Sequence, residues 1–232
     1  QVLKMAKLIS FVMPALNERQ GIGATIKSIP KKELIEKGYG VEIVVIDGGS
    51  IDNTRELALE AGADRVIVSP KGYGKQYKAG FKQALGDIIV TGDSDGTYPF
   101  DRVLDYLKHM EMEDLDFITV NRFANMDPGA MHLTNKIGNL GLTLATNFLF
   151  GLRLRDSQSG MWILKRGHLS KINVQSDGMP FSQELKIECF KKLRSKEING
   201  AYRERFGQTK LMKLKDGYGN LKALFKKRLS ID

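Results

Sequence analysis

Short apolar runs, rich in β-branched residues, alternate with amphipathic segments through the first half of the chain. The runs predict strands at Leu8–Met13, Val41–Ile46, Arg65–Val68, Ile88–Val90 and Phe117–Val120. The segments between them predict helices over about 21–28, 53–61, 75–85 and 101–110, with a charged helix end and loop over about 31–40. Strands that alternate with helices indicate an α/β fold, with a mainly parallel sheet and helices on both faces.

The second half is less regular. Its patterns predict a long helix at Met131–Leu149, a strand at Trp162–Lys165, an amphipathic helix at Ser182–Leu193, an extended segment at Glu197–Arg205 and a short basic helix at Asn220–Leu229. The longest uncharged stretch, Ile137–Leu152, has 16 residues, fewer than the roughly 20 needed to cross a bilayer, so we interpret it as a buried or interfacial helix. Because no repeat or low-complexity linker interrupts the chain, residues 1–232 are expected to form a single domain.

Positive charge is concentrated near the end of the chain. Between Lys186 and Arg228 there are 14 basic and 4 acidic residues, whereas the remainder has 22 basic and 23 acidic residues. This basic region suggests an anionic partner, such as lipid head groups, a phosphorylated substrate or nucleic acid, or else a solvated helix face. The single Cys189 excludes a disulfide framework and fits a reducing compartment.

Polar side chains follow each of the first four predicted strands: Asn17 with Glu18, Asp47, the Lys71–Gly74 loop, and Asp93 with Asp95. The carboxyl ends of parallel strands meet at one edge of an open sheet, where ligands bind. Asp93 and Asp95 have no basic neighbour close in sequence, and a hard divalent cation shared with substrate phosphates would relieve their repulsion. An isolated pair of this kind can also be a solvated turn, but several polar strand ends together indicate a pocket for a nucleotide with Mg²⁺ or Mn²⁺. Neither a GxGxxG pattern nor a Walker A loop is present.

Four motifs together resemble the family 2 glycosyltransferases, which have the GT-A fold: PALNE at 14–18, DGGSIDNT at 47–54, GDSD at 92–95 and DSQSGMW at 156–162. Within that family the chain is similar to polyprenyl-phosphate hexose synthases, the dolichyl-phosphate mannose or glucose synthase type, through Arg122, the DSQSGMW loop and RFGQTK at 205–210. The resemblance covers roughly residues 8–211. It implies a nucleotide-binding half over about 8–120 and an acceptor half over about 121–211. The charge pattern adds a basic amphipathic segment over about 212–232.

The resemblance also implies roles for particular residues. The nucleotide-binding set is Pro14, Ala15, Asn17, Glu18, Asp47, Lys75 and Asp93, with Glu18 towards the ribose and Asp47 towards the base. Asp93 and Asp95 would hold the metal at the diphosphate, with Asp95 the stronger ligand and a catalytic residue. The set near sugar and acceptor is Gln158, Ser159 and Gly160, with Arg122, Arg205 and Lys210 holding the lipid phosphate. Thr97 stands where dolichyl-phosphate mannose synthases commonly carry Gln, so mannose specificity does not follow.

The implied reaction is attack on the anomeric carbon of a UDP or GDP sugar, with inversion carried over from the family. A metal held by two carboxylates would stabilise the negative charge of the departing nucleoside diphosphate. A hydroxyl acceptor would also need a carboxylate base, for which Asp156 and Glu184 are the candidates. Alternatively, Asp156 caps a loop and Glu184 is a solvated helix residue. A phosphate acceptor needs no base, because its second pKa is about 6.

We therefore expect a metal-dependent hexosyltransferase that acts on a polyprenyl phosphate. It would be peripheral at the cytoplasmic face of a membrane, with the helix at 220–229 touching anionic lipid and its basic residues Lys226, Lys227 and Arg228 contributing to that contact. A family 2 enzyme that glycosylates a sugar hydroxyl is the first alternative. Residues 93–97 also match the DxDGT signature of haloacid-dehalogenase phosphatases, but that motif normally follows the first strand of its fold. A nucleic-acid binder would explain the basic region but not the acidic strand ends, so no nucleic-acid partner is expected.

Overall fold

The computed structural model describes residues 7–207 and 213–229. The strands are β1 (Leu8–Ala15), β2 (Gly40–Asp47), β3 (Arg65–Val68), β4 (Ile88–Thr91), β5 (Phe117–Met126), β6 (Trp162–Lys165) and β7 (Ser195–Tyr202). The α-helices are α1 (Ile22–Lys27), α2 (Lys31–Glu36), α3 (Thr54–Glu60), α4 (Tyr73–Gln83), α5 (Val103–Met112), α6 (Leu133–Phe150), α7 (Phe181–Lys192) and α8 (Lys213–Leu229).

Three elements differ from the expectation. The charged segment after α1 contains a helix of its own, α2. Strand β5 continues past Val120 to Met126, because its polar second half still pairs with β7 across an irregularity between Asn121 and Asn125. Helix α8 begins at Lys213 instead of Asn220; two glycines, Gly217 and Gly219, weaken the helical pattern in its first half.

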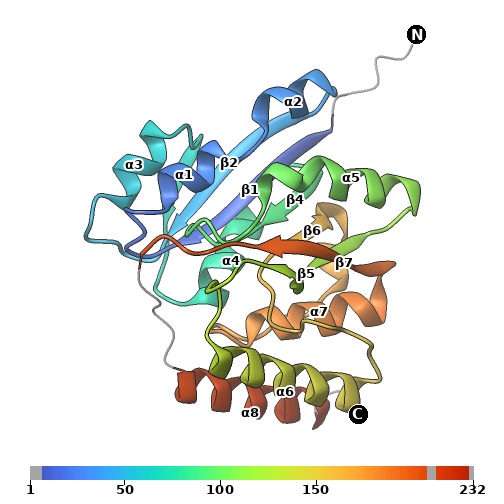
Figure 1. Cartoon of the computed structure of the whole chain (residues 1–232). Helices are drawn as coiled ribbons and strands as arrows, with labels where there is room; N and C mark the ends of the chain where they lie inside the picture. Colours follow the sequence, from blue (N-terminus) through green and yellow to red (C-terminus); the bar gives the residue numbers. More distant parts are fainter. Residues whose placement is uncertain (1–6, 208–212, 230–232) are drawn as a thin grey trace.

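All seven strands form one sheet in the order β3-β2-β1-β4-β6-β5-β7 (Figure 1). Strands β1 to β4 pair in parallel, and so do β5 and β7. Strand β6 runs antiparallel to both of its neighbours, β4 and β5. The mainly parallel sheet is therefore confirmed, with one reversed strand near its middle.

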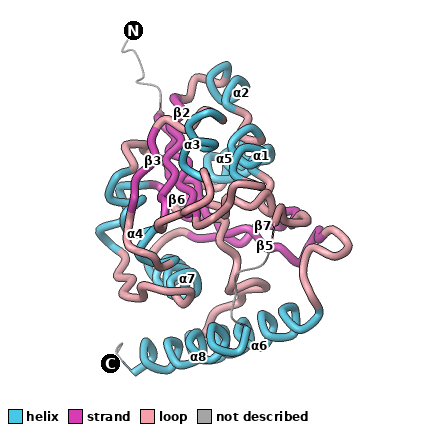
Figure 2. The backbone as a smooth tube through the Cα atoms, turned by 90° about the vertical axis from the view of Figure 1, so that its left-hand side faces the viewer, coloured by secondary structure: helices cyan, strands magenta, loops and turns pink. Residues whose placement is uncertain are grey.

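Helices cover both faces of this sheet (Figures 1 and 2). One hydrophobic cluster joins Ile9 and Phe11 of β1 to residues of α1, α2, α3 and α5. The opposite cluster joins Val12 of β1 to α4 and α7, through Tyr77 and Phe181. Because neighbouring residues of a strand point to opposite faces, β1 is buried on both sides, as its uninterrupted apolar run implies.

Helices α6 and α8 form a further layer outside α7, and they lie side by side in both views (Figures 1 and 2). Phe150 of α6 and Leu224 of α8 cluster with Ile187 of α7. The opposite faces of α6 and α8 therefore point away from the sheet. In the part of the chain that the structure describes, no helix combines the length and apolar character needed to span a membrane.

The reversed direction of β6 brings a late part of the chain to the edge where β1 and β4 end. Val90 pairs with Ile163 in antiparallel register, so β6 begins where β4 finishes. Thr91 Oγ1 donates a hydrogen bond to Gly160 O and accepts one from the N–H of Trp162, both at 2.9 Å. The edge between β1 and β4 is also the point where strand order reverses, which is where open α/β sheets bind ligands.

Candidate active site

Side-chain hydrogen bonds tie the loop after β1 to the loop after β2. Asn17, at φ +53°, accepts the N–H of Ile51 on Oδ1 at 2.9 Å, and its own N–H donates to Ser50 Oγ at 2.8 Å. The N–H of Glu18 donates to Thr54 Oγ1 at 2.8 Å. The PALNE and DGGSIDNT motifs therefore build one continuous wall of the site.

Pro14 and Ala15 take part in this wall through their backbone. Pro14 O accepts the hydroxyl of Ser94 at 2.8 Å, which joins the end of β1 to the loop after β4. Ala15 O accepts the side-chain amide of Gln76 at 2.9 Å. The side chains of α4 and of the β4 loop thus fix the end of β1 in place.

Asp47 lies in a different setting from the one expected of a base-contacting residue. Its carboxylate is fully buried and accepts the N–H groups of Gly49 and Ser50 at 3.1 and 3.0 Å. Arg55 Nε lies 3.9 Å from its Oδ2. These contacts stabilise the tight turn after β2, so Asp47 shapes the loop, while the contact with a base stays a prediction.

Asp93 and Asp95 follow β4 and have different surroundings. Asp95 is 4% exposed, and its Oδ1 accepts the N–H and the hydroxyl of Thr97 at 3.1 and 2.6 Å. Asp93 Oδ1 is also buried, but it accepts no hydrogen bond from the described residues. Burial, and then the charge of Asp95, raise the pKa of Asp93 to about 7, although Arg205 and Arg122 act in the opposite direction. A bound cation would satisfy such an oxygen.

Residues 203–207, which follow β7, cross the loop formed by residues 93–97; we call this segment the strap. The N–H groups of Arg203 and Phe206 donate to backbone carbonyls of that loop at 2.9 and 2.8 Å. Gly96, at φ +83°, leaves room for the Phe206 ring, which would collide with any Cβ at that position. The strap therefore covers the outer side of the Asp93–Asp95 motif.

Arg205 of the strap lies against the acidic side of the site. Its Nη2 is 3.0 Å from Asp95 Oδ2 and 3.5 Å from Glu18 Oε1. In this arrangement Arg205 neutralises two carboxylates, whereas the expectation assigned it to a lipid phosphate. Lys210, which was also expected to hold the lipid phosphate, lies outside the described residues.

The loop before β6 approaches Asp93 closely. The N–H of Gly160 donates to the hydroxyl of Tyr98 at 2.6 Å. A Cβ at Gly160 would lie 3.5 Å from Asp93 Oδ1 and would collide with the hydroxyl of Tyr73. Only glycine fits here, so the predicted sugar-side loop and the predicted metal-side carboxylate do meet in the fold. Tyr73 and Tyr98 were missed by the sequence analysis, since they look like ordinary core residues.

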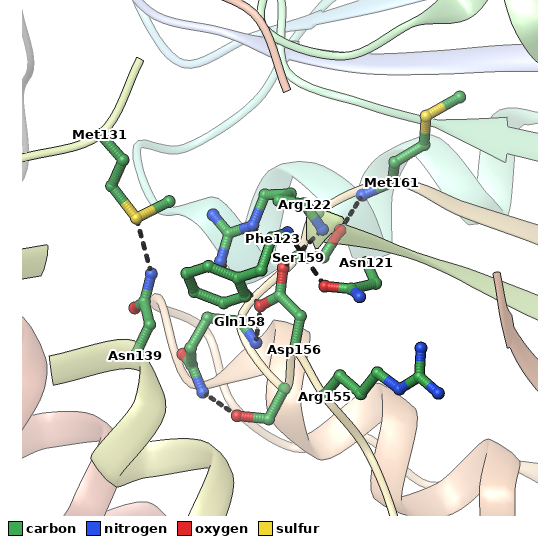
Figure 3. A network of polar contacts seen from close by, with 12 residues as sticks. Asn121, Arg122, Phe123, Met131, Asn139, Arg155, Asp156, Gln158, Ser159 and Met161 are labelled. Carbon is green, nitrogen blue, oxygen red and sulfur yellow. Dashed lines mark hydrogen bonds and ion pairs between the residues drawn. The ribbon is translucent and has the colours of Figure 1, made fainter. Parts of the chain in front are cut away.

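Arg122 and Asp156 form a buried bidentate ion pair (Figure 3). Arg122 Nε and Nη2 donate to the two carboxylate oxygens at 2.7 and 2.9 Å, and the N–H of Gln158 donates at 3.1 Å. Burial raises the pKa of Asp156, but Arg122 outweighs burial and holds that pKa below its ordinary value. These contacts agree with the alternative that Asp156 holds the loop, and the role of Asp156 as a base stays a prediction that the buried ion pair disfavours.

Glu184 is also engaged elsewhere. It accepts the N–H groups of Gln175 and Ser176 at 3.1 and 2.8 Å, and Lys227 Nζ of α8 lies 3.2 Å away. Burial raises the pKa of Glu184, but these donors outweigh it and hold the pKa below its ordinary value. Glu184 thus joins α7 to the preceding loop and to α8, and it is buried instead of solvated. Its role as a base stays a prediction that these contacts disfavour.

The remaining predicted residues, Lys75, Gln158 and Ser159, differ in their burial. Lys75 is exposed in the first turn of α4, and its N–H donates to Asp177 O at 3.1 Å. Gln158 Nε2 donates to Gln183 Oε1 of α7 at 3.0 Å. Ser159 is fully buried, so it supports the loop from inside.

Asp93 and Asp95 fit a metal that takes further ligands from its substrate. Across residues 7–207 and 213–229, no three His, Cys, Asp or Glu side chains gather closely enough to hold a metal ion. Mg²⁺ and Mn²⁺ bind nucleotides through one or two carboxylates, with phosphates and water as the other ligands. The unsatisfied Oδ1 of Asp93 agrees with this mode.

The family model described as "Glycosyl transferase family 2" matches residues 10–172. The chain belongs to this family. It is 34% identical over 223 residues to the low-salt glycan biosynthesis hexosyltransferase Agl6 of Haloferax volcanii, an alignment that covers 94% of this chain and 53% of Agl6. The chain thus spans about half the length of Agl6. It is 31% identical over 205 residues to the dolichyl-phosphate hexose transferase of the same organism, with 88% of this chain and 86% of the relative covered.

Among solved structures, this family 2 chain is similar to glucosyl-3-phosphoglycerate synthase from Mycobacterium tuberculosis in complex with Mn²⁺, UDP and glucosyl-3-phosphoglycerate. The TM-score is 0.74 at 24% identity, with 96% of this chain and 80% of that chain covered. The likeness establishes the GT-A fold that the motifs predicted. The phosphatase alternative is set aside, because the chain belongs to a glycosyltransferase family and its DSDGT motif follows the fourth strand of the sheet.

Proposed function

We propose that this family 2 glycosyltransferase transfers a hexose from a UDP or GDP sugar to a polyprenyl phosphate, with Mg²⁺ or Mn²⁺ held by Asp93 and Asp95. The observation that carries the proposal is the unsatisfied Asp93 Oδ1, at the sheet edge between β1 and β4 and next to Gly160. When bound, a divalent cation would neutralise the departing diphosphate. The dolichyl-phosphate hexose transferase among the relatives supports the choice of acceptor.

The engagement of Asp156 and Glu184 also supports a phosphate acceptor. A sugar hydroxyl needs a base to remove its proton, and both candidates are held by cations or backbone N–H groups. A phosphate monoester carries its negative charge already near neutral pH. The proposal therefore favours phosphate over hydroxyl as the attacking group.

In this proposal the residues around the two carboxylates bind and orient the donor. Glu18 faces the ribose from the wall formed by the β1 and β2 loops, and the loop at 158–160 borders the sugar. Arg122 and Arg205, with Lys210, supply positive charge for the phosphates. Binding of the donor would exchange the contact between Arg205 and Asp95 for contacts with the metal and the diphosphate.

We further propose that the outer faces of α6 and α8 rest on a membrane that contains anionic lipid. Apolar side chains recur on these faces at helical spacing: Leu133, Ile137, Leu140, Leu144 and Phe148 on α6, and Tyr218, Leu221, Phe225 and Leu229 on α8. Phe148 is 89% exposed, and α6 contains no acidic residue. Such amphipathic faces lie in the head-group region of a bilayer.

The basic residues of α8 differ in whether they face this surface. Lys222, Lys226 and Arg228 are exposed beside its apolar stripe. Lys227 instead turns inward, where its Nζ lies 3.2 Å from Glu184 and 2.7 Å from Glu188 of α7. Of the three basic residues expected to touch lipid at 226–228, Lys227 therefore holds α8 to the body. The cytoplasmic face of a membrane stays the predicted location.

A transfer assay with paired acceptors tests this function. The same polyprenyl chain would be offered as a phosphate and as an alcohol, and a glycan with free sugar hydroxyls would be offered separately, each with UDP and GDP hexoses and Mn²⁺. The proposal predicts product from the phosphate alone and from one nucleotide class. Product from a sugar hydroxyl, with none from the polyprenyl phosphate, would favour the alternative family 2 activity.

A further inference from the structure

Lys186 of α7 is fully buried, yet it makes no ion pair at hydrogen-bond distance with a described carboxylate. Its Nζ donates to Ser157 O at 2.8 Å, to Ser159 O at 2.6 Å and to Ser182 Oγ at 3.2 Å. Two of these three acceptors are backbone carbonyls of the loop before β6. Buried lysines are rare unless paired, so this one calls for a specific role.

The three contacts fit the charged form of the side chain. The hydroxyl of Ser182 uses its own hydrogen to donate to Ser159 O at 2.8 Å, so it can only accept from Lys186. All three hydrogens must then come from Nζ, and an ammonium has three whereas a neutral amine has two. Burial lowers the pKa of Lys186 to about 7, and the charge of Asp156 opposes that shift. The Arg122 cation lowers the pKa of Lys186 further, and the Glu197 carboxylate raises it.

The loop held by Lys186 forms the sugar-side wall of the site. Ser159 O accepts a third hydrogen bond, from Trp162 Nε1 at 2.9 Å. One residue later, Gly160 donates to Tyr98 and lies close to Asp93 Oδ1. A displacement of the Ser159 carbonyl would therefore move Gly160 relative to the proposed metal ligand.

We propose that Lys186 is a positioning residue for sugar transfer, whose ammonium fixes the loop at 157–160 against Asp93 and so sets where the donor sugar lies. This inference rests on the proposed function for the identity of the ligand. Lys186 does not touch the reacting atoms in this account; it acts through the backbone of the loop. Removal of a residue that positions active-site groups without touching the substrate typically lowers activity about 10- to 100-fold.

Lys186→Met tests this role, because methionine has similar length and no donor. In this variant Ser159 O keeps its hydrogen bonds from Trp162 Nε1 and Ser182 Oγ, so of the two carbonyls only Ser157 O loses the donor described here, and the variant is expected to fold. Lys192→Met is the matched control, since Lys192 lies on the same helix but pairs at the surface with Glu188. Ser182→Ala is a milder second variant, which removes the two hydrogen bonds of the Ser182 hydroxyl and leaves those from Lys186 to the two carbonyls.

Four measurements separate the outcomes: thermal unfolding, Mn²⁺-dependent binding of UDP or GDP without a sugar, kcat and KM for the nucleotide sugar, and amide exchange of residues 158–161. Lys186→Met should bind the bare nucleotide within about twofold of wild type, lose about 10- to 100-fold in kcat and exchange those amides about tenfold faster. Ser182→Ala should lose about 2- to 10-fold in kcat, and Lys192→Met should match wild type.

Wild-type kcat, KM and amide exchange in Lys186→Met would overturn the inference. An equal loss of nucleotide binding, transfer and thermal stability would also overturn it, since that pattern describes a residue of the fold alone. If wild-type protein binds no nucleotide and transfers no sugar, the proposed function fails instead, and this inference fails with it. The exchange data would then report only whether Lys186 holds the loop.

Discussion

Arg205 Nη2 lies 3.0 Å from Asp95 Oδ2, so the strap delivers a cation to one carboxylate of the Asp93–Asp95 motif. The other carboxylate keeps a buried oxygen without a hydrogen-bond donor from the described chain. The motif is thus half neutralised by the protein itself. A bound metal would neutralise the remaining negative charge of the motif. Arg205 of the strap and the metal would therefore act on the same pair of carboxylates.

Arg205→Met should destabilise the protein in the absence of metal by about 2 kcal/mol, because Asp95 and Glu18 lose a charged hydrogen-bond donor. Saturating Mn²⁺ should remove much of that deficit. Thermal unfolding with and without Mn²⁺ measures both effects, with Arg203→Met as control, since Arg203 pairs with Asp101 on the outside of the strap. If Arg205→Met loses the same stability with and without Mn²⁺, Arg205 does not act at the metal site.

The pKa of Asp93 gives a pH dependence with a defined sign. Its pKa of about 7 in the folded chain lies above the ordinary value of about 3.9. The stability it contributes is therefore fully present below about pH 4 and is lost as pH rises through about 7. Metal binding needs the ionised carboxylate, so the rise in melting temperature with Mn²⁺ should be larger at about pH 8 than at about pH 6. Asp93→Asn should flatten this difference; a Mn²⁺ effect that is independent of pH in wild type would contradict the assignment.

Asp156→Asn should lower the free energy of unfolding by about 3–5 kcal/mol, because Arg122 would be left buried without its counter-ion. For a chain of this size each kcal/mol lowers the melting temperature by about 2–4 °C. Calorimetric unfolding checks this value, and Asp105→Asn, at an exposed pair with Arg102, is the control. A variant of wild-type stability that has lost transfer would instead revive Asp156 as a base.

The apolar faces of α6 and α8 predict binding to anionic vesicles. Phe148→Asp combined with Phe225→Asp should reduce the partition coefficient at least about tenfold, since each change removes buried apolar area and adds a negative charge. Met112→Asp, at a 75% exposed apolar residue of α5, is the matched control. Unchanged sedimentation of the double variant with the vesicles would refute the membrane surface.

Much of the fold follows from local pattern. Arg65–Val68 and Trp162–Lys165 have the predicted bounds, because short apolar runs bounded by polar or turn residues specify short strands. Strand β5 was predicted too short, since its second half is polar and is held by pairing with β7, a partner far away in the sequence. Local pattern carries no information on such pairing.

The same limit applies to the site. Asp93 and Asp95 could be found because two carboxylates at a strand end have a chemical signature. Lys186 could not, because on a helical pattern it looks like a solvated lysine, and its two carbonyl acceptors belong to the loop before β6, which only the fold brings next to α7. Lys227 was misassigned to the surface for the same reason, since Glu184 and Glu188 that hold it lie on another helix.

Titration calorimetry of UDP and GDP, with and without Mn²⁺, on wild type and Asp93→Asn tests whether Asp93 and Asp95 form a metal-dependent nucleotide site. Wild type should bind one of the two nucleotides at least about tenfold more tightly with Mn²⁺, and Asp93→Asn, although folded, should lose the metal dependence. Equal binding with and without Mn²⁺, or no binding of either nucleotide to folded wild type, would contradict a metal-dependent nucleotide site at Asp93 and Asp95.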